Sequence, residues 1–180
     1  DSPEGFHFGP IEAAADRQEE TGRKLPIKRF YLKGNLVEIE DLENNSAVSV
    51  AGQLVDRGLL SKRDYEVIAG AQEKFLYERE PGQQGFPEYY RELKSNFEKV
   101  ENKIGRTLVL PQEELSALLG PNKVLSYKNV FESRYGYATP SYAVFNPNQI
   151  KSADPVTRDE SGNVIPLSER FSPDSADIRY

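Results

Sequence analysis

The stretch from residue 140 to residue 153 constrains the fold more than any other part of the chain. Tyr142 and Val144 belong to a run of residues that favour strands. Asn146-Pro147-Asn148 follows that run directly, and residues of these types end a strand in a sharp turn. The sequence therefore predicts a strand late in the chain that is closed by a specific turn.

The composition excludes several classes of site. The chain has 180 residues, which suffices for one domain with its own core. It contains no cysteine, so disulfides, zinc knuckles and thiol nucleophiles are excluded. With His7 as the single histidine, a multi-histidine metal site is excluded too, and we expect no metal cofactor. A net charge of -6 argues against a general nucleic-acid surface, although residues 23–29 form a small basic cluster.

No apolar run is long enough for a transmembrane helix, and no basic segment precedes an apolar one as in a secretory signal. We therefore expect no membrane-spanning segment and no secretory route. The chain begins with Asp1 and not with Met. From that start we expect a fragment, a processed product or the ordered part of a longer protein.

The first forty residues predict short strands around one helix. A strand is expected within residues 5–9, with Phe6 and Phe8 on one face and His7 on the other. An alanine-rich helix is expected over residues 11–23, directly after a proline. Strands are expected at residues 26–32 and 35–39, paired as a hairpin.

The middle of the chain predicts helices. Ser46 and Ser61 are expected to cap the first two, over residues 47–57 and 61–78, and a third is expected over residues 87–104. These helices form an expected insertion at about 46–104. A strand at 107–110, a short helix from Pro111 to Gly120 and a strand at 123–131 follow. Residues 153–180 are polar and rich in turns, which predicts an irregular C-terminal tail after a domain spanning residues 1–152.

Three segments of the chain resemble the ADP-ribosyltransferase-like domains of phage and mobile-element polyvalent proteins. The most specific is Ser141-Tyr-Ala-Val-Phe-Asn-Pro-Asn-Gln-Ile-Lys-Ser152, which resembles the closing strand of those domains, with residues 127–132 before it. Gly5-Phe-His-Phe-Gly9 with the helix behind it resembles their second motif, and residues 30–39 resemble their central strands. The resemblance implies an α+β fold with a split, mixed or antiparallel sheet, which here carries the helical insertion and the irregular tail.

The resemblance also implies a chemistry. Such enzymes bind NAD and detach nicotinamide while positive charge builds on the ribose, and a carboxylate stabilises that charge. His7 matches the position that stacks on the nicotinamide, and the resemblance places Phe8, Asn129 and Tyr142 beside the cofactor. Glu132 is the nearest catalytic carboxylate. Ser141 stands where many of these enzymes place a glutamate, and the earlier strand that binds the NAD ribose lies outside this sequence.

Three functions remain open on the sequence alone. The first is an ADP-ribosyltransferase that modifies host macromolecules. The second is a non-catalytic copy of the same fold that binds protein partners, such as a parent polyprotein, a virion component or a host protein. The third is a small phage RNase, which would need a general base, an acid and cationic phosphate contacts. The expected location is the virion, the host cytoplasm or both.

Overall fold

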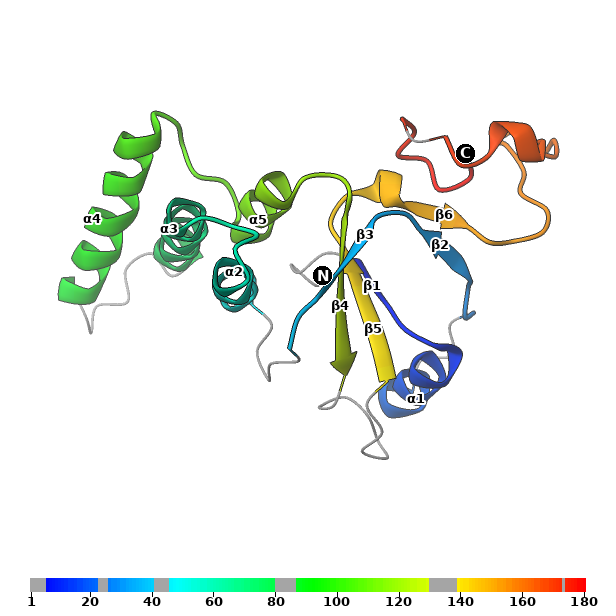
Figure 1. Ribbon diagram of the computed structural model, residues 1–180, viewed down its shortest axis with the longest axis horizontal. Helices are drawn as coiled ribbons and strands as arrows, with labels where there is room; N and C mark the ends of the chain where they lie inside the picture. The colour runs from blue at the N-terminus through cyan, green and yellow to red at the C-terminus, as the bar shows by residue number, and fades with distance from the viewer. Residues whose placement is uncertain (1–5, 23–25, 41–45, 80–86, 130–138, 173) are drawn as a thin grey trace. The chain divides into compact units, whose positions relative to one another are not determined.

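The computed structural model describes residues 6–22, 26–40, 46–79, 87–129, 139–172 and 174–180. These residues form two compact units. Unit 1 comprises Asp1–Glu43 and Gly120–Tyr180, and unit 2 comprises Asn44–Leu119. Unit 1 contains the strands, and unit 2 contains the helices that lie between residues 47 and 119 (Figure 1). The structure confirms an α+β fold with a mixed sheet.

A four-stranded sheet forms the larger part of unit 1. Its spatial order is β1 (Phe6–Phe8), β5 (Thr139–Val144), β4 (Lys123–Asn129) and β3 (Asn35–Glu38). Strand β5 is antiparallel to both of its neighbours, β1 and β4, whereas β3 runs parallel to β4. Helix α1 (Ile11–Thr21) follows β1, as the sequence predicts. The sheet is therefore mixed, with β1 as one of its edge strands.

A second sheet of two antiparallel strands, β2 (Phe30–Leu32) and β6 (Ile150–Ser152), completes unit 1. Val124 and Val144 of the larger sheet form one buried cluster with Ile150 of the smaller sheet. Phe30 and Leu32 pack against that cluster. The two sheets therefore share a hydrophobic core.

The predicted hairpin between residues 26–32 and 35–39 is wrong, because these segments belong to different sheets. The chain changes sheet at Gly34, whose φ is 153°. A Cβ atom at this position would lie 2.8 Å from Val124 Cγ2 and 3.0 Å from the carbonyl oxygen of Asn122. The N–H groups on either side donate to separate partners, that of Lys33 to the oxygen of Gln149 and that of Asn35 to the oxygen of Asn122.

Gln149 holds this crossing point together. Gln149 is the last residue of the short 3-10 turn Pro147–Gln149 between β5 and β6, and its side chain is buried. Its amide nitrogen donates to the carbonyl oxygens of Lys33 at 3.1 Å and of Lys123 at 2.8 Å. Its amide oxygen accepts from the backbone of Asn146. One side chain therefore joins the end of β2, the start of β4 and the turn after β5.

Unit 2 consists of α2 (Ala47–Asp56), α3 (Lys62–Arg79), α4 (Pro87–Ile104) and α5 (Pro111–Leu119). The predicted caps are confirmed: Ser46 accepts from the N–H of Ser49, and Ser61 accepts from that of Asp64. Helix α5 packs against α2 and α3, and this compact unit therefore runs to Leu119, whereas the predicted insertion covered about 46–104. None of the described helices combines the length and the apolar character needed to cross a membrane.

The predicted strand at residues 107–110 is wrong, because side chains take the place of a neighbouring strand. The N–H of Leu108 donates to Glu101 at 2.8 Å, and its carbonyl oxygen accepts from Lys74 at 2.9 Å. The N–H of Val109 donates to Glu114 at 3.1 Å. Buried backbone groups need partners, and these carboxylates and this ammonium supply them without a β-ladder.

Glu114 is the most buried of these carboxylates, with its side chain 1% exposed. Arg106 donates to both of its oxygens, at 2.7 and 2.6 Å. Burial alone would raise the pKa of Glu114, but the hydrogen bonds from Arg106 and from Val109 hold it below the ordinary value. Glu114 is therefore an ionised carboxylate inside the fold, paired with a partly exposed guanidinium.

Replacing Glu114 with Gln tests this pair. The variant keeps the shape of the side chain but loses the charge that Arg106 and Val109 recognise, so we expect the free energy of unfolding to fall by about 2 kcal/mol. Chemical denaturation monitored by circular dichroism measures this change. Glu113→Gln is the matched control, because Glu113 is the exposed neighbour in the same helix. Equal effects of both variants would contradict the role given to Glu114.

Replacing Gln149 with Met tests the junction between the sheets. Methionine fills a similar volume but donates nothing, so the carbonyl groups of Lys33 and Lys123 lose a partner. We expect the free energy of unfolding to fall by about 2 kcal/mol. Gln112→Met, at a partly exposed position on α5, serves as the control in the same denaturation experiment. A Gln149→Met variant as stable as the control would show that the amide does not hold the sheets.

Candidate functional site

The turn between β1 and α1 positions the first group of predicted site residues. Pro10 has extended backbone angles and its carbonyl oxygen accepts from the N–H of Ala14, so the helix begins directly after the strand. Gly9 lies against the sheet, since a Cβ atom there would be 3.7 Å from Ser141 Oγ. The turn therefore brings the start of α1 next to β5.

The register of the sheet places His7 and Ser141 on the same face. His7 lies opposite Ala143, and Ser141 lies opposite Tyr127. Residues directly opposite in antiparallel strands share a face, and so do residues two apart in one strand. The Nδ1 atom of His7 lies 3.0 Å from the hydroxyl oxygen of Tyr127, across the intervening strand β5. This reach is possible because β5 presents the small residues Ser141 and Ala143 between them.

Phe8 and Tyr142 lie on the opposite face of the same sheet. They are paired in the register and pack against the core that the two sheets share. The ring of Phe8 contacts that of Phe30 edge to face, with the centroids 5.7 Å apart. The structure thus separates the predicted set of residues into a polar pair on one face and an aromatic pair on the other.

The two remaining predicted residues cannot be placed in the site. Asn129 is the last residue of β4, opposite Thr139, and its side chain lies outside the described part of the structure. Glu132 lies within residues 130–138, which are also outside it. Ser141 is only 5% exposed, so little of its surface can contact a ligand. His7, in contrast, is exposed.

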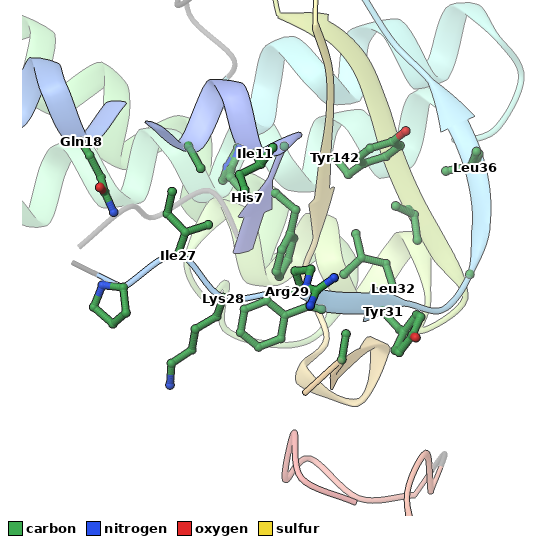
Figure 2. Close-up of a pocket in the computed structure, with 18 of the residues that line it drawn as sticks. His7, Ile11, Gln18, Ile27, Lys28, Arg29, Tyr31, Leu32, Leu36 and Tyr142 are labelled. Atoms are coloured by element: carbon green, nitrogen blue, oxygen red, sulfur yellow. The ribbon is translucent and has the colours of Figure 1, made fainter. Parts of the chain in front are cut away.

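A groove of 1580 Å³ opens beside the aromatic face (Figure 2). The feature is larger than typical small-molecule pockets, which span about 300–1,000 Å³, and it is an open groove, not an enclosed cavity. Aromatic rings from several strands line it, namely Phe8, Phe30, Tyr31 and Tyr142. Because β1 is an edge strand, the groove also reaches His7. Figure 2 shows His7 and Ile11 where β1 meets α1, and the segment that carries Ile27, Lys28 and Arg29.

Sequence reasoning missed the wall of the groove that precedes β2. Residues 26–29 form it, together with Ala153 and Pro155 from beyond β6. The two sides are linked by a hydrogen bond from the N–H of Ala153 to the carbonyl oxygen of Arg29, at 3.0 Å. The basic cluster in the sequence was the available signal for this wall. These basic residues lie in a groove only because β2 pairs with β6, and no local sequence pattern predicts that pairing.

The C-terminal tail, although irregular in secondary structure, packs on β6. Lys151 is buried, and its ammonium donates to the carbonyl oxygens of Ser175 at 2.7 Å and Asp177 at 3.2 Å. Burial lowers the pKa of Lys151, and the Asp177 carboxylate partly opposes that shift. The N–H of Ser152 donates to the oxygen of Ile178.

The same segment also reaches the groove. Arg170 donates to the carbonyl oxygens of Ser152 at 3.0 Å and Asp154 at 2.8 Å. The next residue, Phe171, places its ring edge to face with Tyr31, which lines the groove. The tail therefore supports one wall of the groove.

Among the described residues, no three His, Asp or Glu side chains gather as a metal site would require. Comparison of the chain with protein-family models, with curated proteins and with solved structures finds no match in any of the three. The resemblance to the ADP-ribosyltransferase-like domains therefore stays a prediction that rests on the residues quoted for it.

The ion pair between Asp177 and Arg179, both in the tail, makes the local structure of the tail sensitive to acid. Hydrogen bonds from the Arg179 side chain and backbone lower the pKa of Asp177 to about 2. A carboxylate with a lowered pKa contributes stability above its unfolded pKa, and this contribution is lost as the pH falls through about 2. We expect Arg179→Met to move the pKa of Asp177 back toward the ordinary value of 3.8. An NMR titration of the Asp177 carboxyl carbon measures this, and an unchanged midpoint would contradict it.

Proposed function

We propose that unit 1 binds NAD in the groove and is an ADP-ribosyltransferase-like domain of the kind found in phage and mobile-element polyvalent proteins. The observation that carries the proposal is the groove itself, which combines aromatic walls with an exposed histidine at its edge. Planar rings such as adenine and nicotinamide stack on aromatic side chains. The lining residues therefore fit a ligand with two flat rings.

His7 is the side chain we assign to the nicotinamide end. It is exposed, it lines the groove, and the contact of its Nδ1 atom with the Tyr127 hydroxyl restrains the orientation of the imidazole ring. A restrained ring loses less conformational freedom when a ligand stacks on it. Tyr127 is therefore a positioning residue, which acts on the ligand through His7.

Transfer of ADP-ribose requires a negative charge close to the ribose, because positive charge builds there as nicotinamide departs. Ser141 cannot supply that charge, although it shares a face with His7. We assign the role to Glu132, which follows β4 in the sequence. Its acceptor would be a host macromolecule.

A second candidate function is protein binding without catalysis. Three aliphatic residues that line the groove are strongly exposed: Ile11 at 62%, Ile27 at 41% and Leu36 at 66%. Apolar side chains exposed along a groove are typical of sites that bind a partner. The partner would be the parent polyprotein, a virion component or a host protein.

Titration of the purified chain with NAD, followed by calorimetry, tests the first candidate. We expect saturable binding and an approximately tenfold loss of affinity in His7→Ala, since stacking on one ring contributes about 1–3 kcal/mol. His7→Phe is the matched variant, because it keeps an aromatic ring while losing the contact with Tyr127, and it should retain most of the affinity. Absence of saturable binding at millimolar NAD would overturn the proposal.

Release of nicotinamide, measured in the same samples by chromatography, separates the two candidates. An active transferase releases nicotinamide, and Glu132→Gln should abolish the release while leaving NAD affinity within about threefold, because the substitution removes a charge and keeps the shape. Binding without any release in the unmodified chain would favour the non-catalytic function.

A further inference from the structure

We propose that Lys28 and Arg29 form the anion-binding part of the groove and hold the diphosphate that joins the two halves of a dinucleotide. This inference rests on the proposed function and adds the residues that recognise the charged centre of the ligand. The sequence identifies both residues only as members of a small basic cluster. The structure places them on the wall of a groove whose other side chains are mostly apolar.

The charge of the groove differs from that of the whole chain. The chain has 29 Asp and Glu residues against 23 Lys and Arg residues. Among the described residues that line the groove, Lys28 and Arg29 are the charged ones, and none is Asp or Glu. A cleft lined by one sign of charge attracts ligands of the opposite sign. The groove is therefore selective for an anion even though the protein is acidic.

The backbone fixes where these cations lie. The carbonyl oxygen of Arg29 accepts from the N–H of Ala153, which extends the pairing of β2 with β6 by one residue. Phe30 follows at once and packs against the shared core. The backbone that carries the two cations is therefore fixed by its hydrogen bond to Ala153 and by the packing of Phe30, while the side chains of Lys28 and Arg29 remain exposed. In the part of the chain that the structure describes, no carboxylate forms an ion pair with either of them.

The chemistry of the two side chains matches a diphosphate. The guanidinium of Arg29 presents a planar fork of donors that can bind two phosphate oxygens, and the ammonium of Lys28 adds a second positive charge on the same segment. A dinucleotide carries its negative charges between two flat rings. The groove is lined by aromatic rings, which suit the two flat rings, and by two cations, which suit the phosphates. The structure therefore assigns the charged centre of the ligand to the segment before β2.

A pair of double variants tests this assignment. Lys28→Gln/Arg29→Gln removes both groove cations, and Lys62→Gln/Arg63→Gln removes the same two residue types from an exposed site at the start of α3 in unit 2. Both variants change the net charge equally. We expect the groove variant to raise the Kd for NAD at least about tenfold and the control variant to leave it within about twofold, because hydrogen bonds to charged groups are the strong ones. The groove variant should also show a weaker dependence of Kd on salt.

ADP and nicotinamide are the second set of probes, measured by ligand-observed NMR. We expect the groove variant to lose affinity for ADP, which carries a diphosphate, and to keep its affinity for nicotinamide, which carries none. Equal NAD affinity in the groove variant and the unmodified chain would overturn the inference while leaving the proposed function intact. ADP binding that is lost in the groove variant would support the inference even if NAD itself fails to bind. Failure of the unmodified chain to bind both NAD and ADP would overturn the two proposals together.

Discussion

Unit 1 depends on one buried amide. Gln149 donates to the backbone at the end of β2 and at the start of β4, and accepts from the turn after β5, so a single side chain holds three segments that are far apart in sequence. The chain passes between the sheets twice at this place, once at Gly34 and once at the turn that contains Gln149 itself. Phe8, Phe30 and Tyr142, which pack against the core that the two sheets share, also line the groove.

In unit 2, too, polar side chains form hydrogen bonds with backbone groups outside regular secondary structure. The segment at residues 107–110 has backbone groups that would normally pair with another strand, and Glu101, Glu114 and Lys74 supply the partners. Charged side chains used in this way must be kept charged inside the fold, and the lowered pKa values of both glutamates show that their donors more than compensate for burial. Both units therefore use long polar side chains to satisfy irregular backbone.

The sequence predicts what is encoded within a few residues. The caps at Ser46 and Ser61, the helix that starts at Pro111 and the turn after β5 were all predictable, because each depends on residues close to it. The pairing of β2 was not, since its partner is β6 and the chain changes sheet at Gly34, whose neighbours come from two other segments. The candidate site follows the same division. Alternation along β1 separates His7 from Phe8, as predicted, but the wall formed by residues 26–29 exists only because β2 pairs with β6.

The C-terminal tail packs on the smaller sheet, so the folded unit extends beyond residue 152. A two-stranded sheet is marginally stable by itself, and β2 with β6 is such a sheet. One of its faces rests on the larger sheet, and on the other Lys151 and Tyr31 meet the tail at Ser175, Asp177 and Phe171. A chain cut after Ser152 would retain every segment that resembles a known family. It would, however, remove the two carbonyl groups that accept from Lys151 and leave the smaller sheet covered on one side only. The segment that looks most dispensable in the sequence is thus part of the minimal folding unit.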